Sequence, residues 1–289
     1  MARFRAIVTR GVAGLAVAAA VMATWAGPAQ AHDQGGGRGH GQGPAGQHRP
    51  ATLFVAGDST AATWPASTAP KAGWGQALPA FLDSRDLVVA NRALSGASSK
   101  SFIEVGLLDG ILADLRPGDY LLISFGHNDE KTDARHTDPY TTYQEYLTRY
   151  IDGARSHGAH PLLATPVERR RFNADGNATA SHGEYPAAML ALAAATRVPV
   201  VDLTARSMLL WDQLGVEGTK ACFLWLTAGQ VANYPDGSAD NTHFQAHGAI
   251  EVARLVVADL VRQRALPARA VTGLHHPVAD DELVWPETI

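Results

Sequence analysis

The alternation of short apolar runs with longer amphipathic segments most constrains the fold of this chain. Five runs consist mostly of Val, Leu, Ile and Ala, as expected of strands buried on both faces. They span residues 52–57, 87–93, 120–126, 161–166 and 198–203, and segments of helical period occupy 73–85, 102–115, 138–158, 184–197 and 246–266. Such alternation produces a parallel sheet covered by helices. We therefore predict an α/β fold, a three-layer α/β/α sandwich with a doubly wound parallel sheet.

The first 31 residues have the pattern of an export signal. Arg3, Arg5 and Arg10 precede an apolar run, which ends in the small-residue motif of residues 29–31. This pattern predicts a signal peptide cleaved after Ala31, with an uncleaved membrane anchor as the alternative. We expect a secreted protein without membrane association after cleavage.

A linker and one folded domain are predicted to follow the signal. Residues 32–50 are rich in Gly, Gln, Pro and His and show no apolar periodicity, which predicts a disordered linker. Residues 51–267 are long enough to form one domain with a full hydrophobic core. For the C-terminal extension, residues 268–289, the sequence leaves the degree of order open.

Charge and cysteine content exclude several classes of protein. The signal contains three arginines and no acidic residue, so its cleavage changes the formal charge of the chain from −4 to −7. An acidic domain without a basic run argues against nucleic-acid binding. Cys222 is the single cysteine, so no internal disulfide can form, and we expect a buried, unreactive thiol. No closely spaced metal-ligand set occurs, and we expect neither a metal nor a cofactor.

Ligands of a doubly wound sheet bind beyond the carboxyl ends of its strands, so the residues that follow each strand are the candidates for chemistry. Three predicted strands lead into unusual sequences, "GDST" at 57–60, "NRALSGASSKSF" at 91–102 and "GHNDE" at 126–130. A fourth, "DNTHF" at 240–244, directly precedes the last predicted helix.

These sequences contain the parts of a serine hydrolase. Ser59 follows a strand at an expected strand-to-helix turn, or nucleophile elbow, where its hydroxyl would be exposed and its own N–H would face the same space. Alternatively, Ser59 could cap the following helix. His243 could act as base, oriented by Asp240 three residues earlier on one tight loop. Alternatively, Asp240 or Asn241 caps the final helix, and His247 is a rival base.

An acyl transfer also needs hydrogen-bond donors where negative charge develops on the substrate oxygen. The backbone N–H of Gly96 and the side-chain amide of Asn128 are the candidates for this oxyanion hole. Taken singly, Gly96 could be a plain turn former and Asn128 a plain loop residue.

The order and placement of these motifs resemble the SGNH, or GDSL-like, hydrolases. More closely, "GDST", "GWGQALPAFL", "NRALSGASSKSF", "FGHNDEK", "TPVERRRF" and "NYPDGSADNTHFQAHGA" resemble the rhamnogalacturonan acetylesterase family, over about residues 52–262. The resemblance implies the SGNH/flavodoxin-like sandwich. It also implies that Ser59, Asp240 and His243 are catalytic and that Ser59, Gly96 and Asn128 form the oxyanion hole.

One departure from the family pattern affects the expected substrate. The family usually reads Gly-Arg-Ser-x-Arg-Ser after the second turn, where this chain has "GASSKS", with Ala97 and Lys100 in place of the arginines. The loss of a bidentate donor leaves the identity of the substrate open but does not affect the acyl chemistry.

The resemblance implies a secreted esterase that removes O-acetyl groups from a plant cell-wall polysaccharide, rhamnogalacturonan or pectin. Arg170 and Arg171 could contact a uronic acid or be solvated charges, and Trp64 could stack on a sugar ring or lie in the core. The alternatives are an SGNH esterase for xylan acetyl, lipid or thioester acyl groups, and a non-catalytic carbohydrate-binding protein. The sequence does not determine the oligomeric state.

Overall fold

The computed structural model describes residues 49–289, so the predicted signal and nearly all of the predicted linker lie outside the described residues. Five parallel strands form the central sheet, β1 (Ala51–Gly57), β3 (Leu87–Asn91), β4 (Tyr120–Ser124), β5 (His160–Ala164) and β6 (Val200–Val201). Their order is β3-β1-β4-β5-β6. The predicted parallel sheet is therefore confirmed.

The sheet is doubly wound, and the winding direction reverses beside β1. The chain passes from β1 to β3 on one side, then returns to β4 on the other side and continues to β5 and β6. A reversal of this kind opens a crevice at the carboxyl ends of the two strands that flank it, here β1 and β4. The loops after these two strands carry Ser59 and Asn128.

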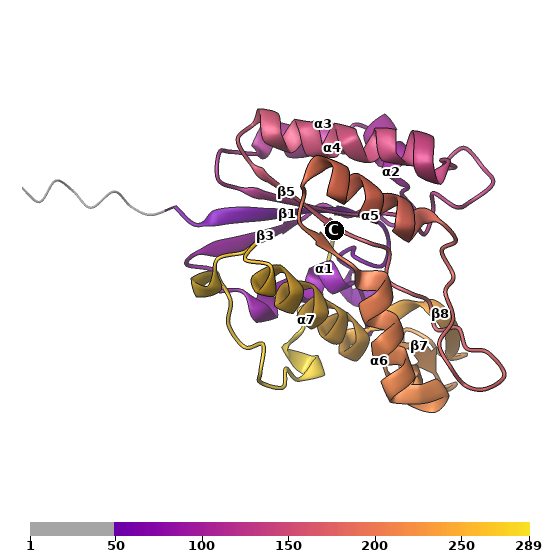
Figure 1. Cartoon of the computed structure of the whole chain (residues 1–289). Coiled ribbons are helices and arrows are strands. Elements are labelled where there is room, and N and C mark those ends of the chain that lie inside the picture. The colour runs from indigo at the N-terminus through magenta and orange to yellow at the C-terminus, as the bar shows by residue number, and fades with distance from the viewer. Residues whose placement is uncertain (1–48) are drawn as a thin grey trace, which may run out of the picture. The chain divides into compact units, whose positions relative to one another are not determined.

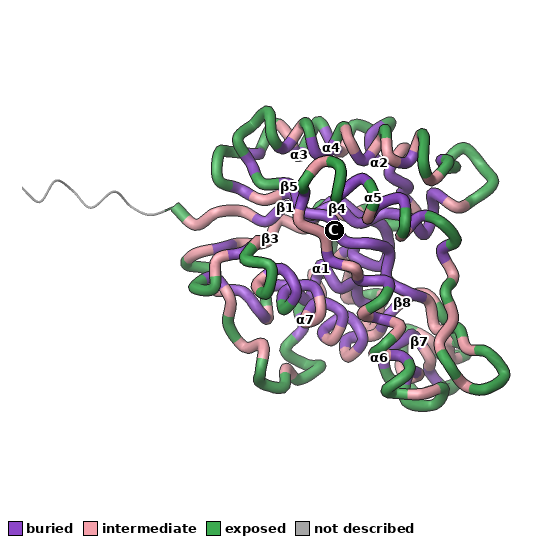
Figure 2. Tube along the Cα trace, viewed as in Figure 1, coloured by how far each residue is buried: buried purple, intermediate pink, exposed green. Residues whose placement is uncertain are grey.

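Helices cover both faces of the sheet, which confirms the three-layer sandwich (Figure 1). Alternate residues of β1 face opposite layers: Phe54 and Ala56 belong to one core cluster, Leu53 and Val55 to the other. The first cluster includes residues from α2 (Ser99–Glu104), α3 (Leu107–Asp114), α4 (Gln144–Ser156) and α5 (Tyr185–Thr196). The second includes residues from α1 (Trp74–Ala77), α6 (Leu203–Gly218) and α7 (Ala246–Arg262). Figure 2 shows the buried band between the two helical layers.

A second, smaller sheet is present that the sequence did not predict. Its antiparallel strands lie in the order β2 (Lys71–Ala72), β8 (Ser238–Gln245) and β7 (Phe223–Leu226). Phe223 and Phe244 face each other across β7 and β8, and their rings pack against Trp211 of α6. This aromatic cluster joins the small sheet to the core of the domain.

The prediction of one tight loop for Asp240 and His243 is wrong, because both residues belong to strand β8. The strand is irregular at this point. Phe244 pairs with Phe223, but the next pair joins Ala239 to Trp225, so four residues of β8 lie opposite a single residue of β7. Such a bulge redirects side chains locally while the flanking residues keep the strand paired.

Several predicted element boundaries also differ from the structure. The predicted strand 198–203 is only two residues long, because Asp202 caps α6 by accepting a hydrogen bond from the Ala205 N–H. The predicted helix 102–115 is two helices, separated at Gly106, whose φ of 81° no right-handed helix accommodates. A π-helical turn, η3 (Pro139–Tyr143), occupies the start of the predicted helix 138–158.

The C-terminal residues 268–289 pack against the domain. They contain two short 3₁₀ turns, η5 (Ala268–Ala270) and η6 (Asp280–Glu282), and Leu283 is buried. The Trp285 indole donates a hydrogen bond to the backbone oxygen of Lys71 at 2.8 Å. Within residues 49–289, none of the helices has the length and apolar character needed to cross a membrane.

Candidate active site

Ser59, His243 and Asp240 form one hydrogen-bonded chain at the carboxyl edge of the central sheet. The Ser59 Oγ lies 2.9 Å from the His243 Nε2, and the His243 Nδ1 lies 2.7 Å from the Asp240 Oδ2. A carboxylate at Nδ1 favours the tautomer that carries its proton there, which leaves Nε2 free to accept the hydroxyl proton. The turn that follows β1 and the bulge of β8 thus lie next to each other at this edge of the sheet.

The turn after β1 holds Ser59 in place. The Asp58 carboxylate accepts hydrogen bonds from the N–H and hydroxyl of Thr60, at 2.9 and 2.8 Å. The expected strand-to-helix elbow is wrong, because the chain makes a turn here and first becomes helical at η1 (Ala66–Thr68). For the same reason Ser59 does not cap a helix, and its side chain is mostly buried rather than exposed.

The bulge of β8 fixes Asp240 from its own backbone. The Asp240 Oδ1 accepts hydrogen bonds from the N–H groups of Thr242 and His243, at 2.7 and 3.0 Å. Partial burial raises the pKa of Asp240, but hydrogen bonds from the His243 side chain and backbone outweigh burial and lower it to about 2. Asp240 is therefore ionised at neutral pH, and it orients His243 as a charged acceptor.

The alternative roles for this segment do not match the geometry. Helix α7 begins at Ala246, and the residue that precedes it is Gln245, so Asp240 does not cap it. The His247 Nδ1 faces Asp280 of the C-terminal segment at 3.4 Å. Of the two histidines, His243 is the one that contacts the Ser59 hydroxyl.

The two remaining loops place Gly96 and Asn128 side by side. The Leu94 N–H donates to the Gly57 oxygen, which ties the turn after β3 to the end of β1. The Asn128 Nδ2 donates to the Ala97 oxygen at 2.9 Å, so one of its two protons is used and the other is available. Among the described residues, no protein group accepts a hydrogen bond from the backbone N–H of Ser59 or Gly96. Ser59, Gly96, Asn128, Asp240 and His243 together are called the candidate active site below.

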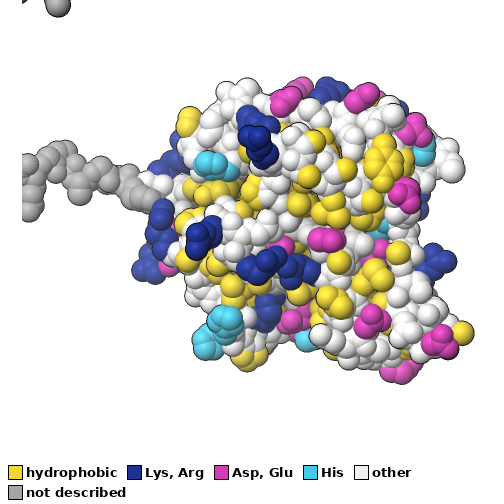
Figure 3. Space-filling model, viewed as in Figure 1, with side chains coloured by type: hydrophobic (Ala, Val, Ile, Leu, Met, Phe, Trp, Pro, Cys, Tyr) yellow, Lys and Arg dark blue, Asp and Glu magenta, His cyan; other side chains and the backbone are white. Residues whose placement is uncertain are grey.

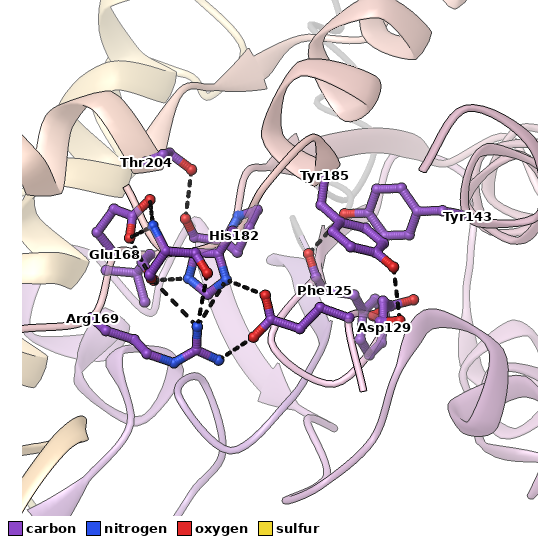
Figure 4. Close-up of polar contacts among 12 residues, drawn as sticks. Phe125, Asp129, Tyr143, Glu168, Arg169, His182, Tyr185 and Thr204 are labelled. Carbon is purple, nitrogen blue, oxygen red and sulfur yellow. Dashed lines mark hydrogen bonds and ion pairs between the residues drawn. The ribbon is translucent and has the colours of Figure 1, made fainter. Parts of the chain in front are cut away.

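A buried polar network supports the loop that carries Asn128 (Figure 4). Tyr143 donates to the Phe125 oxygen and Tyr185 to the Asp129 oxygen, at 2.8 and 2.9 Å. The Asp129 carboxyl accepts hydrogen bonds from Ser99, and burial raises its pKa to about 6. Glu130, the next residue in the loop, forms an ion pair with Arg169 at 2.5 Å. The loop is thus held from both sides along the backbone next to Asn128.

Of the three residues predicted to contact substrate, Trp64 lies beside the catalytic candidates, whereas Arg170 and Arg171 form no hydrogen bond with them. The Trp64 ring lies edge-on to the His243 imidazole, with 5.9 Å between centroids, and its Nε1 donates to the Ser59 oxygen. The Arg170 guanidinium lies over the Trp225 ring and donates to the Val216 oxygen, so packing and backbone contacts occupy it. Arg171 is exposed.

Two residues near the candidate active site were not predicted from the sequence. The Lys71 Nζ lies 3.6 Å from the centroid of the Trp64 ring, and partial burial lowers the pKa of this lysine although Asp240 opposes the shift. The Arg135 Nη1 donates to the Asn128 Oδ1 at 3.2 Å and to the Gly96 oxygen at 3.3 Å. The sequence around Lys71 does not indicate a site, because the strand that places it there, β8, lies far away in the chain. Arg135 could have been suspected from its proximity to "GHNDE".

The chain is similar to known proteins in sequence and in structure. A profile of the family described as GDSL-like Lipase/Acylhydrolase matches residues 55–249, a range that contains the whole candidate active site. Rhamnogalacturonan acetylesterase RhgT of Bacillus subtilis (strain 168) is 47% identical over 76% of this chain and 94% of its own length. The probable rhamnogalacturonan acetylesterase YesY of the same organism is 40% identical over 74% and 94%. The crystal structure of the B. subtilis protein YxiM has a TM-score of 0.65 at 30% identity, over 74% of this chain and 57% of that one.

Proposed function

The chain belongs to the rhamnogalacturonan acetylesterase family of the GDSL-like lipases and acylhydrolases, and we propose that Ser59, His243 and Asp240 are its catalytic triad. Family membership makes the protein a carboxylic ester hydrolase, as the resemblance implied. The observation that carries the assignment of the triad is the continuous hydrogen-bonded chain from Ser59 through His243 to Asp240.

In the first half of the proposed reaction, the His243 Nε2 takes the hydroxyl proton as the Ser59 Oγ attacks the acetyl carbonyl carbon. The carbonyl oxygen becomes negatively charged and is stabilised by the Ser59 N–H, the Gly96 N–H and the free proton of the Asn128 amide. Each such donor contributes about 3 kcal/mol to the stability of the transition state. The tetrahedral intermediate collapses, the C–O bond to the sugar breaks, and His243 returns its proton to the sugar oxygen.

In the second half, water hydrolyses the acetyl-Ser59 intermediate. His243 takes a proton from the water as its oxygen attacks the acetyl carbon, and the same three donors hold the oxyanion. Collapse breaks the bond to the Ser59 Oγ, which regains its proton from His243, and acetate leaves. Asp240 remains ionised throughout and stabilises the imidazolium that forms in each half.

We propose an acetylated pectic polysaccharide as the substrate. RhgT and YesY, which match this chain over nearly their whole lengths, are named for rhamnogalacturonan. Lys71 supports an anionic substrate, because no carboxylate among the described residues forms an ion pair with it. Its ammonium lies against Trp64, whose other neighbour is His243, so a uronic-acid carboxylate could pair with Lys71 while an acetyl group reaches Ser59.

We further propose that the protein acts outside the cell. This location follows from the pattern of the first 31 residues and agrees with a substrate that occurs in plant cell walls. The mature N-terminus of secreted protein, measured by mass spectrometry, would show whether cleavage follows Ala31.

The test of the proposed function is acetate release from a panel of acetylated polysaccharides. The panel contains acetylated rhamnogalacturonan and acetylated xylan, and the Ser59→Ala variant is measured in parallel. Long-chain 4-nitrophenyl esters are assayed separately by release of 4-nitrophenol. We expect the highest kcat/KM on rhamnogalacturonan and a loss on the order of 10⁴-fold or more in the variant.

Two outcomes of this test would contradict the proposal. A preference for long acyl chains or xylan would assign the same chemistry to another ester. Undiminished turnover in the Ser59→Ala variant would remove Ser59 from the mechanism and leave polysaccharide binding as the function to be explained.

A further inference from the structure

A basic cavity lies at the opposite end of the central sheet from Ser59. Its volume is about 460 Å³, within the range typical of small-ligand sites, and it is bordered by the amino ends of β4, β5 and β6. Three arginines line it, Arg155, Arg197 and Arg264, together with Tyr120 and His160. We call these five residues the basic cavity. No aspartate or glutamate lines it.

The three arginines reach the basic cavity from three separate helices. Arg155 lies in the last turn of α4, Arg197 directly follows α5, and Arg264 comes two residues after the end of α7. A cation at the carboxyl end of a helix interacts favourably with the helix dipole. That effect accounts for each arginine separately, but it does not account for three helix ends that bring arginines to the lining of one cavity.

Two of these arginines occupy strained backbone positions. Arg197 and Arg264 have φ angles of 56° and 59°, and they are the two non-glycine residues with positive φ in the described part of the chain. Glycine is the residue that adopts this conformation without cost after a helix. The guanidinium groups are therefore present at sites where the backbone would favour glycine.

The arginines of the basic cavity have no acidic partner. No carboxylate in residues 49–289 lies within 4.0 Å of their guanidinium nitrogens, and the Arg155 Nη2 instead donates to the Thr196 oxygen. Most other described arginines form ion pairs, namely Arg49, Arg85, Arg92, Arg135, Arg169, Arg206, Arg254, Arg262 and Arg269. Figure 3 shows Lys and Arg side chains gathered at the end of the molecule where the strands begin.

An aromatic surface completes the basic cavity. The rings of Tyr120 and His160 contact each other in a tilted arrangement, with centroids 5.1 Å apart and planes inclined by 35°. Flat rings beside guanidinium groups match a sugar that carries a carboxylate, because the rings contact its apolar face and the arginines bind the carboxylate in bidentate fashion.

We propose that the basic cavity binds the carboxylates of a polyuronate chain and forms a second polysaccharide site, distinct from the candidate active site. This binding requires no ester and no triad, so it does not depend on the proposed reaction. A polyuronate fits an acidic domain better than nucleic acid does, because its charge is less dense and the contact is confined to one cavity.

The test uses the full-length protein and a non-acetylated oligogalacturonate, with the Kd measured by isothermal titration calorimetry. The variant is Arg197→Gly combined with Arg264→Gly, because glycine removes the charge and also suits the positive φ of both positions. Its thermal midpoint should therefore be no lower than that of the wild type. We expect its affinity for the oligogalacturonate to fall about tenfold or more.

Two comparisons distinguish the basic cavity from other sources of binding. The charge-matched control Lys131→Met with Arg149→Met alters two exposed cations outside the cavity and should bind as the wild type does. The Lys71→Met variant changes the surroundings of the candidate active site and leaves the basic cavity intact. If Lys71→Met still binds the oligogalacturonate and the glycine variant does not, the ligand binds in the basic cavity.

The opposite results overturn the proposal. Binding that is lost in Lys71→Met and kept in the glycine variant would place the oligogalacturonate near Ser59, which would leave the proposed function intact. Equal binding of a neutral xylo-oligosaccharide would remove the role of the carboxylates. Saturation by inorganic phosphate without binding of the oligogalacturonate would make the cavity a small-anion site.

Discussion

At the scale of single residues, two carboxyl groups of this protein show opposite pKa shifts. Burial dominates at Asp129 and raises its pKa to about 6. At Asp240, hydrogen bonds from the His243 side chain and backbone outweigh burial and lower it to about 2. Both residues belong to short polar motifs, and the motifs alone do not distinguish their environments. The difference depends on which donors the fold brings to each carboxylate.

Arg135 links the two loops that carry the oxyanion-hole residues Gly96 and Asn128. Its guanidinium bonds to the Asn128 side chain and the Gly96 oxygen, and Asp133 holds it with hydrogen bonds of 2.6 and 2.9 Å. We predict that Arg135→Met lowers kcat about tenfold with little change in KM, because Asn128 loses its orientation but the sugar contacts remain. Steady-state kinetics on an acetylated substrate measure both constants. An equal effect in the exposed-site control Arg149→Met would contradict this role.

Lys71 is predicted to select anionic substrates. Its ammonium is held over Trp64 without an ion-pair partner among the described residues. We expect Lys71→Met to lower the ratio of kcat/KM for acetylated rhamnogalacturonan over kcat/KM for 4-nitrophenyl acetate by about three- to tenfold, an effect that added salt reduces. Lys131→Met is the matched control. An unchanged ratio in Lys71→Met would exclude this lysine from substrate recognition.

At the scale of elements, the C-terminal segment and α1 together hold the loop that carries Trp64. The Gln76 side chain of α1 accepts a hydrogen bond from the Trp64 N–H and donates one to the Val284 oxygen, at 3.0 and 2.8 Å. The Ala66 N–H donates to the Pro286 oxygen, and the Asn233 side chain donates to the Ala66 oxygen. The C-terminal residues therefore contribute to the surroundings of His243 although they lie far from it in sequence.

This arrangement predicts a joint effect on activity and stability. Gln76→Leu keeps the approximate side-chain volume but leaves two backbone groups without their partner, which costs about 1–3 kcal/mol for each group that stays buried. We expect a lower thermal midpoint and a several-fold lower kcat/KM. The control Gln144→Leu removes one hydrogen bond, to the Ala188 oxygen, on the other face of the sheet. If both variants lose stability and keep full activity, Gln76 does not position the Trp64 loop.

At the scale of the whole molecule, folding stability should depend on pH through Asp129. Its pKa is about 6 in the folded protein, against 3.8 as the ordinary value, so the folded state keeps a proton that the unfolded chain releases. The contribution of Asp129 to the free energy of unfolding is therefore present below about pH 4, declines as pH rises to about 6, and is constant above that.

The measurement is the free energy of unfolding from urea titrations between pH 4 and pH 7, compared between the wild type and Asp129→Asn. Because other carboxylates also titrate, the difference between the two curves isolates this residue. We predict that the difference changes by up to about 3 kcal/mol across this range. The exposed Asp152→Asn variant should show a flat difference curve. A flat curve for Asp129→Asn as well would mean that the folded protein does not raise this pKa.

The sequence determined the parts of this protein whose signal is local. Near-continuous apolar runs show which segments are buried on both faces, so the five parallel strands and the two helical layers could be predicted. Because parallel strands end at one edge of a sheet, the residues that follow them could be grouped from the order of the motifs along the chain. Ser59, Gly96 and Asn128 were singled out in this way.

Only the tertiary structure decided what depends on contacts between distant segments. The pairing of β8 with β2 and β7 placed Asp240 and His243 on a bulged strand rather than a loop, and it brought Lys71 toward Trp64. The basic cavity likewise combines three helix ends that share no motif. The apolar pattern of a strand or helix is a property of consecutive residues, so it can be recognised in the sequence. Cross-strand pairing, ion pairs and pKa shifts arise between segments, and their partners become defined when the chain folds.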